Sequence, residues 1–160
     1  MDGERTPAHS RRKALKPYPH SLPAILMRAR EAVMARVRPT LREYEVTEPQ
    51  WRVLRTLCSL EEIEVTQLAD LVFLLPSSLS RILRDLGERE LIQRRTSDSD
   101  LRRGLVSISD KGMALIEAAS PSAARTNAEI ERLFGAERMG RLRGLLTELE
   151  EALGFAKPTE

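Results

Sequence analysis

The sequence of 160 residues is poor in cysteine, histidine and aromatic side chains, and it lacks long apolar runs. Its single cysteine, Cys58, excludes an internal disulfide and is typical of a reducing compartment. No apolar run approaches the roughly 18 residues of a membrane-spanning helix. The first twenty residues contain no apolar segment of a secretion signal. We therefore expect a cytoplasmic protein with no membrane partner.

The sequence also lacks the residue clusters that support catalysis. Its two histidines, His9 and His20, both lie near the N-terminus. Neither a glycine-rich phosphate loop nor a metal-ligand spacing occurs along the chain. These absences predict a protein that is not an enzyme and that uses no cofactor and no metal.

What the sequence does contain is aliphatic and charged. Hydrophobic residues make up 41% of the chain and aromatic residues only 4%, so the expected core consists of Leu, Ile, Val, Ala and Met side chains. Lysine and arginine number 26 against 24 acidic residues, which gives a formal net charge of +2. Nucleic-acid binding would therefore depend on where the positive charge is placed rather than on its total.

The segment Pro76–Glu90, PSSLSRILRDLGERE, has the pattern of an amphipathic helix. At about 100° per residue, its apolar stripe consists of Leu79, Ile82, Leu83 and Leu86. The opposite side and its flank carry Ser77, Ser80, Arg81 and Arg84. Small hydroxyls and guanidiniums near a helix N-terminus suit the major groove of DNA. Alone, the pattern also fits an ordinary solvated helix, so the interpretation depends on the neighbouring segments.

A strong start signal predicts another helix before this segment. Thr47 is the expected N-cap, Gln50 occupies the capping-box position, and Pro49 lies in the first turn. The side chains that this helix is expected to bury are Trp51, Leu54, Leu57 and Cys58.

The chain between that helix and Pro76 is expected to form a loop and one short helix. Glu61, Glu62 and Glu64 indicate the loop, and Thr66 opens the short helix. Two short helices joined by a turn, the second with a polar outer face, predict a helix-turn-helix.

After Glu90 the hydrophobic period changes to that of a strand. Residues 91–95 and 105–108 flank a turn-rich stretch, and the second segment alternates as a strand does. They predict a β-hairpin whose tip holds Asp100, Arg102 and Arg103. A hairpin directly after a recognition helix is a wing, and an arginine at its tip would fit the minor groove. The alternative is an ordinary solvated hairpin.

Before the helix-turn-helix, the sequence predicts a tail and a long helix. Residues 1–20 are rich in proline and basic side chains, and we expect a mobile basic tail there. Ser21 is the expected N-cap of a helix from Leu22 to about Tyr44, with a kink at Pro39.

After the hairpin, two further helices are predicted. Ser109 caps the first, which reaches Phe134, and the last runs from Ala136 to Gly154. Apolar side chains recur along the last helix at Met139, Leu142, Leu145, Leu146, Leu149 and Leu153. Such a stripe requires a partner, which is either the first helix or a second copy of the chain.

With these elements in place, the chain resembles repressors of the MarR (multiple antibiotic resistance regulator) family over residues 22–154. The most specific match is SSLSRILRDLGERELIQRR…DSDLRRGLVSISDKG, which corresponds to the family's recognition helix, wing and closing turn. The segment LPAILMRAREAVMARVRPTLREYEVTEPQWRVLRTL is similar to the subgroup that regulates homoprotocatechuate (4-hydroxyphenylacetate) degradation. The family usually has Gly where this chain has Glu90. Because Glu adopts a positive φ poorly, we expect the recognition helix to end differently here.

The resemblance implies a mainly α fold with a small β-hairpin wing, in which helices from both ends of the chain form a dimerisation region. The winged helix-turn-helix would span 47–109, the dimerisation region 21–46 and 110–155, and the tail 1–20. The implied dimerisation residues are Leu22, Ile25, Leu142, Leu145, Leu146, Leu149 and Leu153.

The resemblance also implies a double-stranded DNA operator as partner. The residues implied to face the major groove are Ser77, Ser78, Ser80, Arg81 and Arg84. Arg102 and Arg103 would enter the minor groove, Asp100 would orient the neighbouring arginine, and Arg94 and Arg95 would contact phosphates. A symmetric dimer would bind a pseudo-palindromic operator with half-sites roughly 10 bp apart.

A small phenolic acid is the effector that the subgroup implies, and control of aromatic-compound catabolism is the implied role. The candidate effector residues are His20, Ser21, Arg28, Arg30 and Trp51. The alternatives are a core position for Trp51 and surface ion pairs for the two arginines. Two other modes of regulation stay open: DNA binding without any effector, and a redox response through Cys58.

Overall fold

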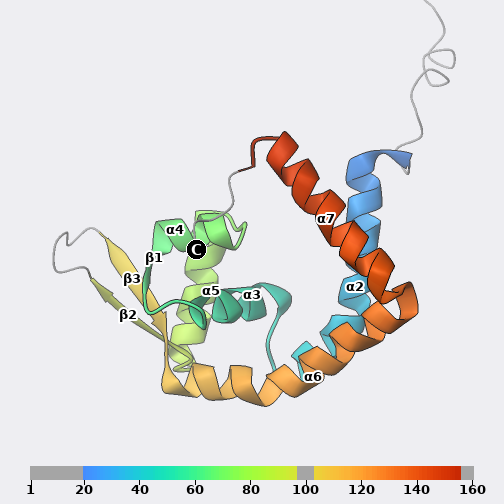
Figure 1. Cartoon of the computed structure of the whole chain (residues 1–160). Helices are drawn as coiled ribbons and strands as arrows, with labels where there is room; N and C mark the ends of the chain where they lie inside the picture. Colours follow the sequence, from blue (N-terminus) through green and yellow to red (C-terminus); the bar gives the residue numbers. More distant parts are fainter. Residues whose placement is uncertain (1–19, 97–102, 156–160) are drawn as a thin grey trace, which may run out of the picture. The chain divides into compact units, whose positions relative to one another are not determined.

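The computed structural model describes residues 20–96 and 103–155 (Figure 1). Its helices and strands are, in chain order, α2 (Leu22–Glu43), α3 (Glu48–Leu57), β1 (Ile63–Glu64), α4 (Val65–Leu71), α5 (Pro76–Glu88), β2 (Ile92–Thr96), β3 (Gly104–Ile108), α6 (Asp110–Phe134) and α7 (Ala136–Ala152). The mainly α fold with a small wing is therefore confirmed. The chain divides into two units, Met1–Arg36 and Val37–Glu160, with the boundary inside α2. Apart from His20, the predicted tail lies outside the described residues.

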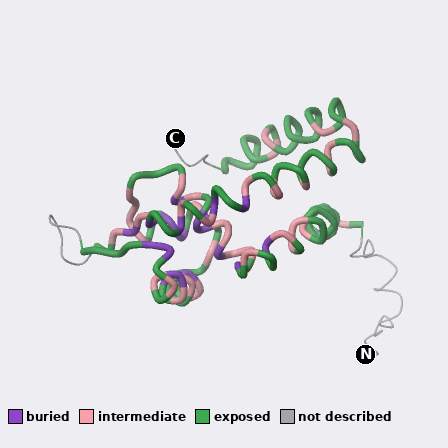
Figure 2. Tube along the Cα trace, turned by 90° about the horizontal axis from the view of Figure 1, so that it is seen from below, coloured by how far each residue is buried: buried purple, intermediate pink, exposed green. Residues whose placement is uncertain are grey.

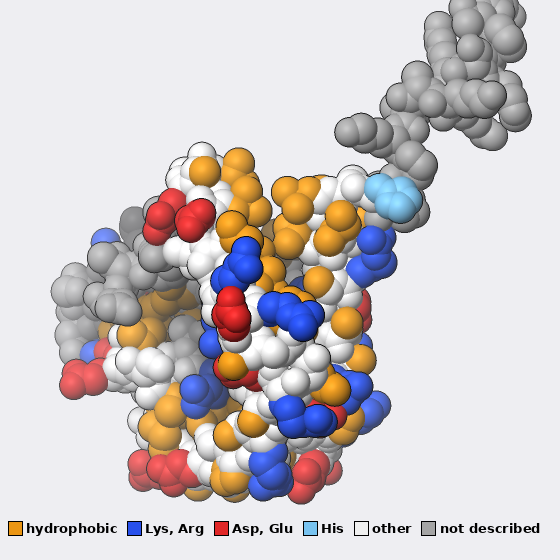
Figure 3. All heavy atoms as spheres, turned by 45° about the vertical axis from the view of Figure 1, so that its right-hand side comes forward, with side chains coloured by type: hydrophobic (Ala, Val, Ile, Leu, Met, Phe, Trp, Pro, Cys, Tyr) orange, Lys and Arg blue, Asp and Glu red, His pale blue; other side chains and the backbone are white. Residues whose placement is uncertain are grey.

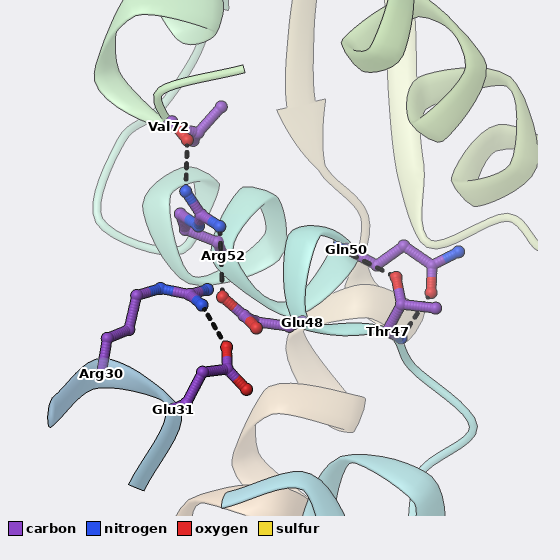
Figure 4. A network of polar contacts seen from close by, with 7 residues as sticks. All are labelled: Arg30, Glu31, Thr47, Glu48, Gln50, Arg52 and Val72. Atoms are coloured by element: carbon purple, nitrogen blue, oxygen red, sulfur yellow. Dashed lines mark hydrogen bonds and ion pairs between the residues drawn. The ribbon is translucent and has the colours of Figure 1, made fainter. Parts of the chain in front are cut away.

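The starts of α3 and α6 follow from capping side chains. At α3, Thr47 Oγ1 accepts a hydrogen bond from the backbone N–H of Gln50 at 3.4 Å, and Gln50 Oε1 accepts one from the N–H of Thr47 at 2.7 Å (Figure 4). At α6, Ser109 Oγ accepts from the N–H of Gly112 at 3.0 Å. Each bond satisfies a backbone donor that the first helical turn leaves unpaired. Both predicted caps are confirmed.

The wing is part of a three-stranded antiparallel sheet with the order β1-β3-β2. In the hairpin, Ile92 pairs with Ile108 and Thr96 with Gly104, which confirms the predicted strands. The prediction of a loop through Glu64 was wrong, because this residue belongs to β1 and pairs with Leu105 of β3. A two-residue strand shows no periodicity in sequence, since only its pairing with a distant strand defines it.

The core of the second unit is aliphatic, as predicted. Its fully buried side chains are Val53, Leu54 and Leu57 of α3, Leu68 of α4, Val72 just after α4, Leu79, Leu83 and Leu86 of α5, Val106 of β3 and Ile116 of α6. The prediction that α3 buries Trp51 and Cys58 was wrong, because both are half-buried. The buried face of α3 is instead centred on Val53 and Leu54, with Gln50 at its start. The helix is therefore rotated about its own axis, by a fraction of a turn, from the predicted orientation.

The end of α5 differs from the expectation for Glu90. This residue takes the left-handed conformation, with φ of +60°, in spite of its side chain. Its N–H donates to the carbonyl of Gly87 at 2.9 Å, and the N–H of Leu91 donates to that of Leu86 at 2.9 Å, as in a glycine-terminated helix. The carbonyl of Glu90 accepts from Ser109 Oγ at 2.6 Å, which ties this turn to the start of α6. The expectation of a different ending was therefore wrong.

The two C-terminal helices differ in how far they are packed. Ile116 and Ala119 of α6 are buried, whereas α7 has no buried residue (Figure 2). The hydroxyl of Tyr44 donates to the carbonyl of Ala118 at 2.7 Å, which joins the segment after α2 to α6. Although α6 is long, the described part of the chain contains no helix apolar enough to cross a membrane.

Candidate nucleic-acid interface

α5 separates its side chains into a core face and a surface face. Leu79, Leu83 and Leu86 have no exposed surface. On the other side, Ser77, Ser80, Arg81 and Arg84 are exposed, and Ser78 is half-buried. The Ser80 hydroxyl donates to the carbonyl of Pro76 at 2.9 Å, so its oxygen remains available as an acceptor. The predicted polar face of this helix is therefore a surface of the second unit.

The two arginines of α5 have no acidic side chain as an ion-pair partner among the described residues. Neither Arg81 nor Arg84 forms an ion pair or hydrogen bond with another residue that the structure describes. Both line an open hollow of about 520 Å³ between α5 and the start of α3. Asp85 and Glu88 line the same hollow, so its charge is mixed. Exposed guanidiniums of this kind attract phosphates and can make paired hydrogen bonds with guanine.

Two side-chain contacts hold α5 against the start of α3 and against the connection that precedes it. Gln50 Nε2 donates to Asp85 Oδ2, so one amide both caps α3 and binds α5. Arg89, at the end of α5, donates from Nη1 to the carbonyl of Glu45 at 2.9 Å. Sequence reasoning missed both contacts, because their partners are 35 and 44 residues apart and share no local pattern.

A third contact fixes the turn before α5. Arg52 of α3 donates from Nη1 to the carbonyl of Val72 at 2.8 Å, and its Nη2 lies 3.3 Å from Glu48 Oε1 (Figure 4). The arginine is half-buried, so this contact is shielded from solvent more than a surface ion pair. It satisfies a carbonyl at the end of α4 that has no intrahelical partner. This positioning role of Arg52 was also missed from the sequence.

On the wing, the arginines predicted to contact DNA, Arg94 and Arg95 at phosphates and Arg103 in the minor groove, differ in their surroundings. Arg95 binds Glu62 through two hydrogen bonds, Nε to Oε1 at 2.8 Å and Nη2 to Oε2 at 2.6 Å. Arg103 Nη1 lies 2.6 Å from Glu64 Oε1. Arg94, in contrast, is exposed and forms no ion pair or hydrogen bond within the described ranges. The two acidic partners lie in the segment predicted as a loop.

The surface beside the wing contains a second hollow, of about 320 Å³. Arg94 and Arg103 line it together with Thr66 and Gly104. Two predicted wing-tip residues, Asp100 and Arg102, lie outside the described residues. Their roles stay predictions.

The candidate effector residues fall on two elements. Four lie at or near the start of α2, where Ser21 Oγ accepts from the N–H of Ala24 at 3.4 Å and Arg30 forms an ion pair with Glu31 at 3.0 Å. The fifth, on α3, is half-buried. An effector role stays a prediction for all five, which are His20, Ser21, Arg28, Arg30 and Trp51.

The predicted dimerisation residues are largely at the surface. On α2, Leu22 and Ile25 are exposed. On α7, Leu149 is half-buried, and the exposed positions are Leu142, Leu145, Leu146 and Leu153. Hydrophobic side chains reach the surface among basic ones on the face that Figure 3 shows. Their role in dimerisation stays a prediction.

Cys58 packs against a second sulfur atom. Its Sγ lies 3.4 Å from Sδ of Met113, and the residue is half-buried. A thiol beside a thioether packs as a small hydrophobic group does. The redox response through Cys58 stays a prediction.

Comparisons with known proteins agree on one family. The model of the MarR family matches residues 46–103. The homoprotocatechuate degradative operon repressor of Escherichia coli is 34% identical over 128 residues, covering 80% of this chain and 86% of that protein. The crystal structure of NadR in complex with 4-hydroxyphenylacetate is similar with a TM-score of 0.77 and 30% identity, covering 84% of this chain and 98% of that one. The repressor CouR bound to a 23-mer DNA duplex has a TM-score of 0.75 and 25% identity, covering 84% and 97%.

Proposed function

This chain belongs to the MarR family of transcriptional regulators, and on that premise we propose that it acts as a homodimeric repressor that a small phenolic acid releases from its operator. Membership of the family makes the chain a DNA-binding regulator rather than an enzyme. The observation that carries the proposal is the division of α5, whose leucines are fully buried while Arg81 and Arg84 are exposed and unpaired within the described residues.

In the proposed complex, α5 enters the major groove. Arg81 and Arg84 would contact guanine edges, and the serines would contact bases or phosphates. Arg94 would contact the phosphate backbone beside the wing, because its charge is not neutralised by a described acidic residue. The proposed major-groove residues are Ser77, Ser78, Ser80, Arg81 and Arg84.

The proposed dimer follows from the apolar surface of α7. A helix with a leucine stripe and no buried residue leaves a large apolar surface in water. A symmetric dimer buries such a surface against itself and presents two copies of α5 to DNA. The proposed operator is therefore pseudo-palindromic, with half-sites roughly 10 bp apart.

The proposed effector is a phenolic acid, and the proposed target genes serve the catabolism of aromatic compounds. Support comes from two similar proteins, a homoprotocatechuate degradative operon repressor and NadR, which was crystallised in complex with 4-hydroxyphenylacetate. Arg28 or Arg30 would bind the carboxylate. Such an effector weakens DNA binding only by the difference between its affinities for the DNA-binding and released conformations.

The first test measures DNA binding by fluorescence anisotropy at fixed salt. The probes are a duplex from the region upstream of the chain's own gene and a random duplex of equal length. Arg81→Ala is expected to weaken operator binding by about 1–3 kcal/mol. Arg55→Ala, which removes an exposed arginine of α3, controls for the change in net charge. Equal effects of the two substitutions would contradict a specific role for α5.

The second test adds 4-hydroxyphenylacetate or homoprotocatechuate to the operator complex, with phenylacetate as the control that lacks a ring hydroxyl. Release by the phenolic acids is expected in the wild type. Arg28→Ala should reduce this release and leave operator affinity without effector unchanged. Operator binding that none of the acids affects would exclude the effector and leave the role in DNA binding intact.

A further inference from the structure

Two acidic residues border the wing sheet at positions that bring them to its arginines. β3 is the central strand, and it pairs with β1 on one side and β2 on the other. Glu64 of β1 and Arg95 of β2 both pair with Leu105, so these three residues form one row across the sheet. Glu62 lies just before β1. The short strand β1 therefore places carboxylates beside the wing.

Both carboxylates form close ion pairs with wing arginines. Glu62 accepts two hydrogen bonds from Arg95, at 2.8 and 2.6 Å, in the fork geometry that suits a carboxylate and a guanidinium. Glu64 lies 2.6 Å from Arg103. The acidic side chains are the less exposed partners, at 28% and 25%, against 51% and 57% for the arginines. The carboxylates are therefore more buried than the guanidiniums with which they pair.

The chain thus has two classes of arginine on its candidate DNA-binding surface. Arg81, Arg84 and Arg94 have no acidic partner among the described residues. Arg95 and Arg103 each have one. An arginine that neutralises a phosphate releases a condensed counterion, which is the main source of sequence-independent affinity for DNA. A guanidinium whose charge a carboxylate already balances contributes little to this term.

We propose that Glu62 and Glu64 hold Arg95 and Arg103 away from DNA phosphates and thereby lower the sequence-independent affinity of the chain for DNA. The inference rests on the proposed DNA-binding function and deepens it. On random DNA, where phosphate contacts supply nearly all the affinity, the two ion pairs weaken binding. On the operator, base contacts from α5 supply additional affinity that the ion pairs leave untouched. The ion pairs therefore lower both affinities by a similar factor and leave the ratio of operator to random affinity nearly unchanged, because the phosphate contribution is common to both complexes.

The test compares three substitutions that remove one negative charge each. Glu62→Gln and Glu64→Gln remove the ion pairs. Glu61→Gln is the matched control, because Glu61 is an exposed neighbour that forms no ion pair or hydrogen bond within the described part of the chain. Binding to the operator and to a random duplex is measured over a series of salt concentrations. Thermal unfolding of each variant checks that the fold is intact.

We expect Glu62→Gln and Glu64→Gln to strengthen binding to random DNA several-fold more than Glu61→Gln does. The slope of log affinity against log salt should steepen by about 0.9 for each arginine that gains a phosphate. Operator affinity should rise by a similar factor, because the phosphate contribution is common to both complexes. In an Arg95→Gln background, the extra effect of Glu62→Gln should disappear, since the two residues act through one contact.

Two outcomes would overturn the inference. Equal effects of all three substitutions would mean that net charge alone matters. Weaker binding of Glu62→Gln or Glu64→Gln to random DNA would mean that the carboxylates present the arginines to phosphates. These results are separate from the proposed function, which fails if the wild type shows no preference for its operator. The comparison on random DNA can be made in either case.

Discussion

The helices α5 and α7 have similar leucine patterns but opposite surroundings. Leu79, Leu83 and Leu86 of α5 have no exposed surface, whereas Leu145 of α7 is 60% exposed and no residue of α7 is buried. The apolar face of α5 is satisfied within the chain, and only its polar face is left for a partner. The apolar face of α7 is not satisfied within the chain. The same sequence periodicity thus accompanies an internal core in one helix and, in the proposed dimer, an intermolecular surface in the other.

The largest expected effect tests the apolar face of α7. Leu145→Glu should dissociate the proposed dimer, because each buried leucine contributes about 1.5–3 kcal/mol and a symmetric interface carries the change twice. The expected loss is therefore about 3–6 kcal/mol per dimer. Sedimentation velocity over a range of concentrations measures it. Leu145→Met, which keeps an apolar side chain, should remain dimeric. An unchanged sedimentation profile for Leu145→Glu would remove the contrast between the two helices.

The next effect tests the apolar face of α5. Leu83→Ala should lower the free energy of unfolding by about 2–5 kcal/mol, because it leaves a cavity among fully buried side chains. Urea unfolding monitored by circular dichroism measures it. Leu146→Ala of α7, studied at a concentration where the protein is monomeric, should cost much less. Equal costs would mean that both helices are packed within one chain.

A smaller effect concerns the contact between Gln50 and Asp85 that holds α5. Gln50→Glu keeps an oxygen for the N–H of Thr47 but places two carboxylates together, and should lower stability by about 1–3 kcal/mol. Asp85→Asn in the same chain should restore most of the loss, because its amide can donate to Glu. Urea unfolding of the two single variants and the double variant forms the cycle. Strictly additive effects would show that the two side chains do not interact.

The smallest effect concerns the residues with positive φ at the end of α5 and at the start of α7. Gly135, before α7, has φ of +97°, which suits glycine, whereas α5 ends through Glu90 at φ of +60°. Glu90→Gly should raise stability by about 1 kcal/mol, because it relieves a left-handed conformation. The lost ion pair with Lys111 is exposed and contributes little. Glu90→Ala is the control, since it removes the ion pair but keeps a Cβ atom. Thermal unfolding should rank Gly above Glu and Ala.

The sequence predicts what local chemistry determines. The capping residues Thr47 and Ser109 define helix starts, and the spacing of leucines defines the buried face of α5. The strand β1 could not be predicted, because two residues carry no period. The same limit applies to the long-range contacts at the candidate interface. The pair of Glu62 and Arg95, for example, joins residues 33 apart that only the sheet brings together.

Three side chains that position the winged region share one property: they donate to main-chain carbonyls. Tyr44 donates to Ala118, Arg52 to Val72, and Arg89 to Glu45. In evolutionary terms, a substitution of the accepting residue does not remove the acceptor of the hydrogen bond, since every amino acid supplies the same backbone carbonyl. A substitution at one of the three acceptor positions therefore leaves the hydrogen bond in place, whereas a substitution at one of the three donor positions removes it. Among descendants of this gene, the three contacts can persist while the side chains at the acceptor positions change.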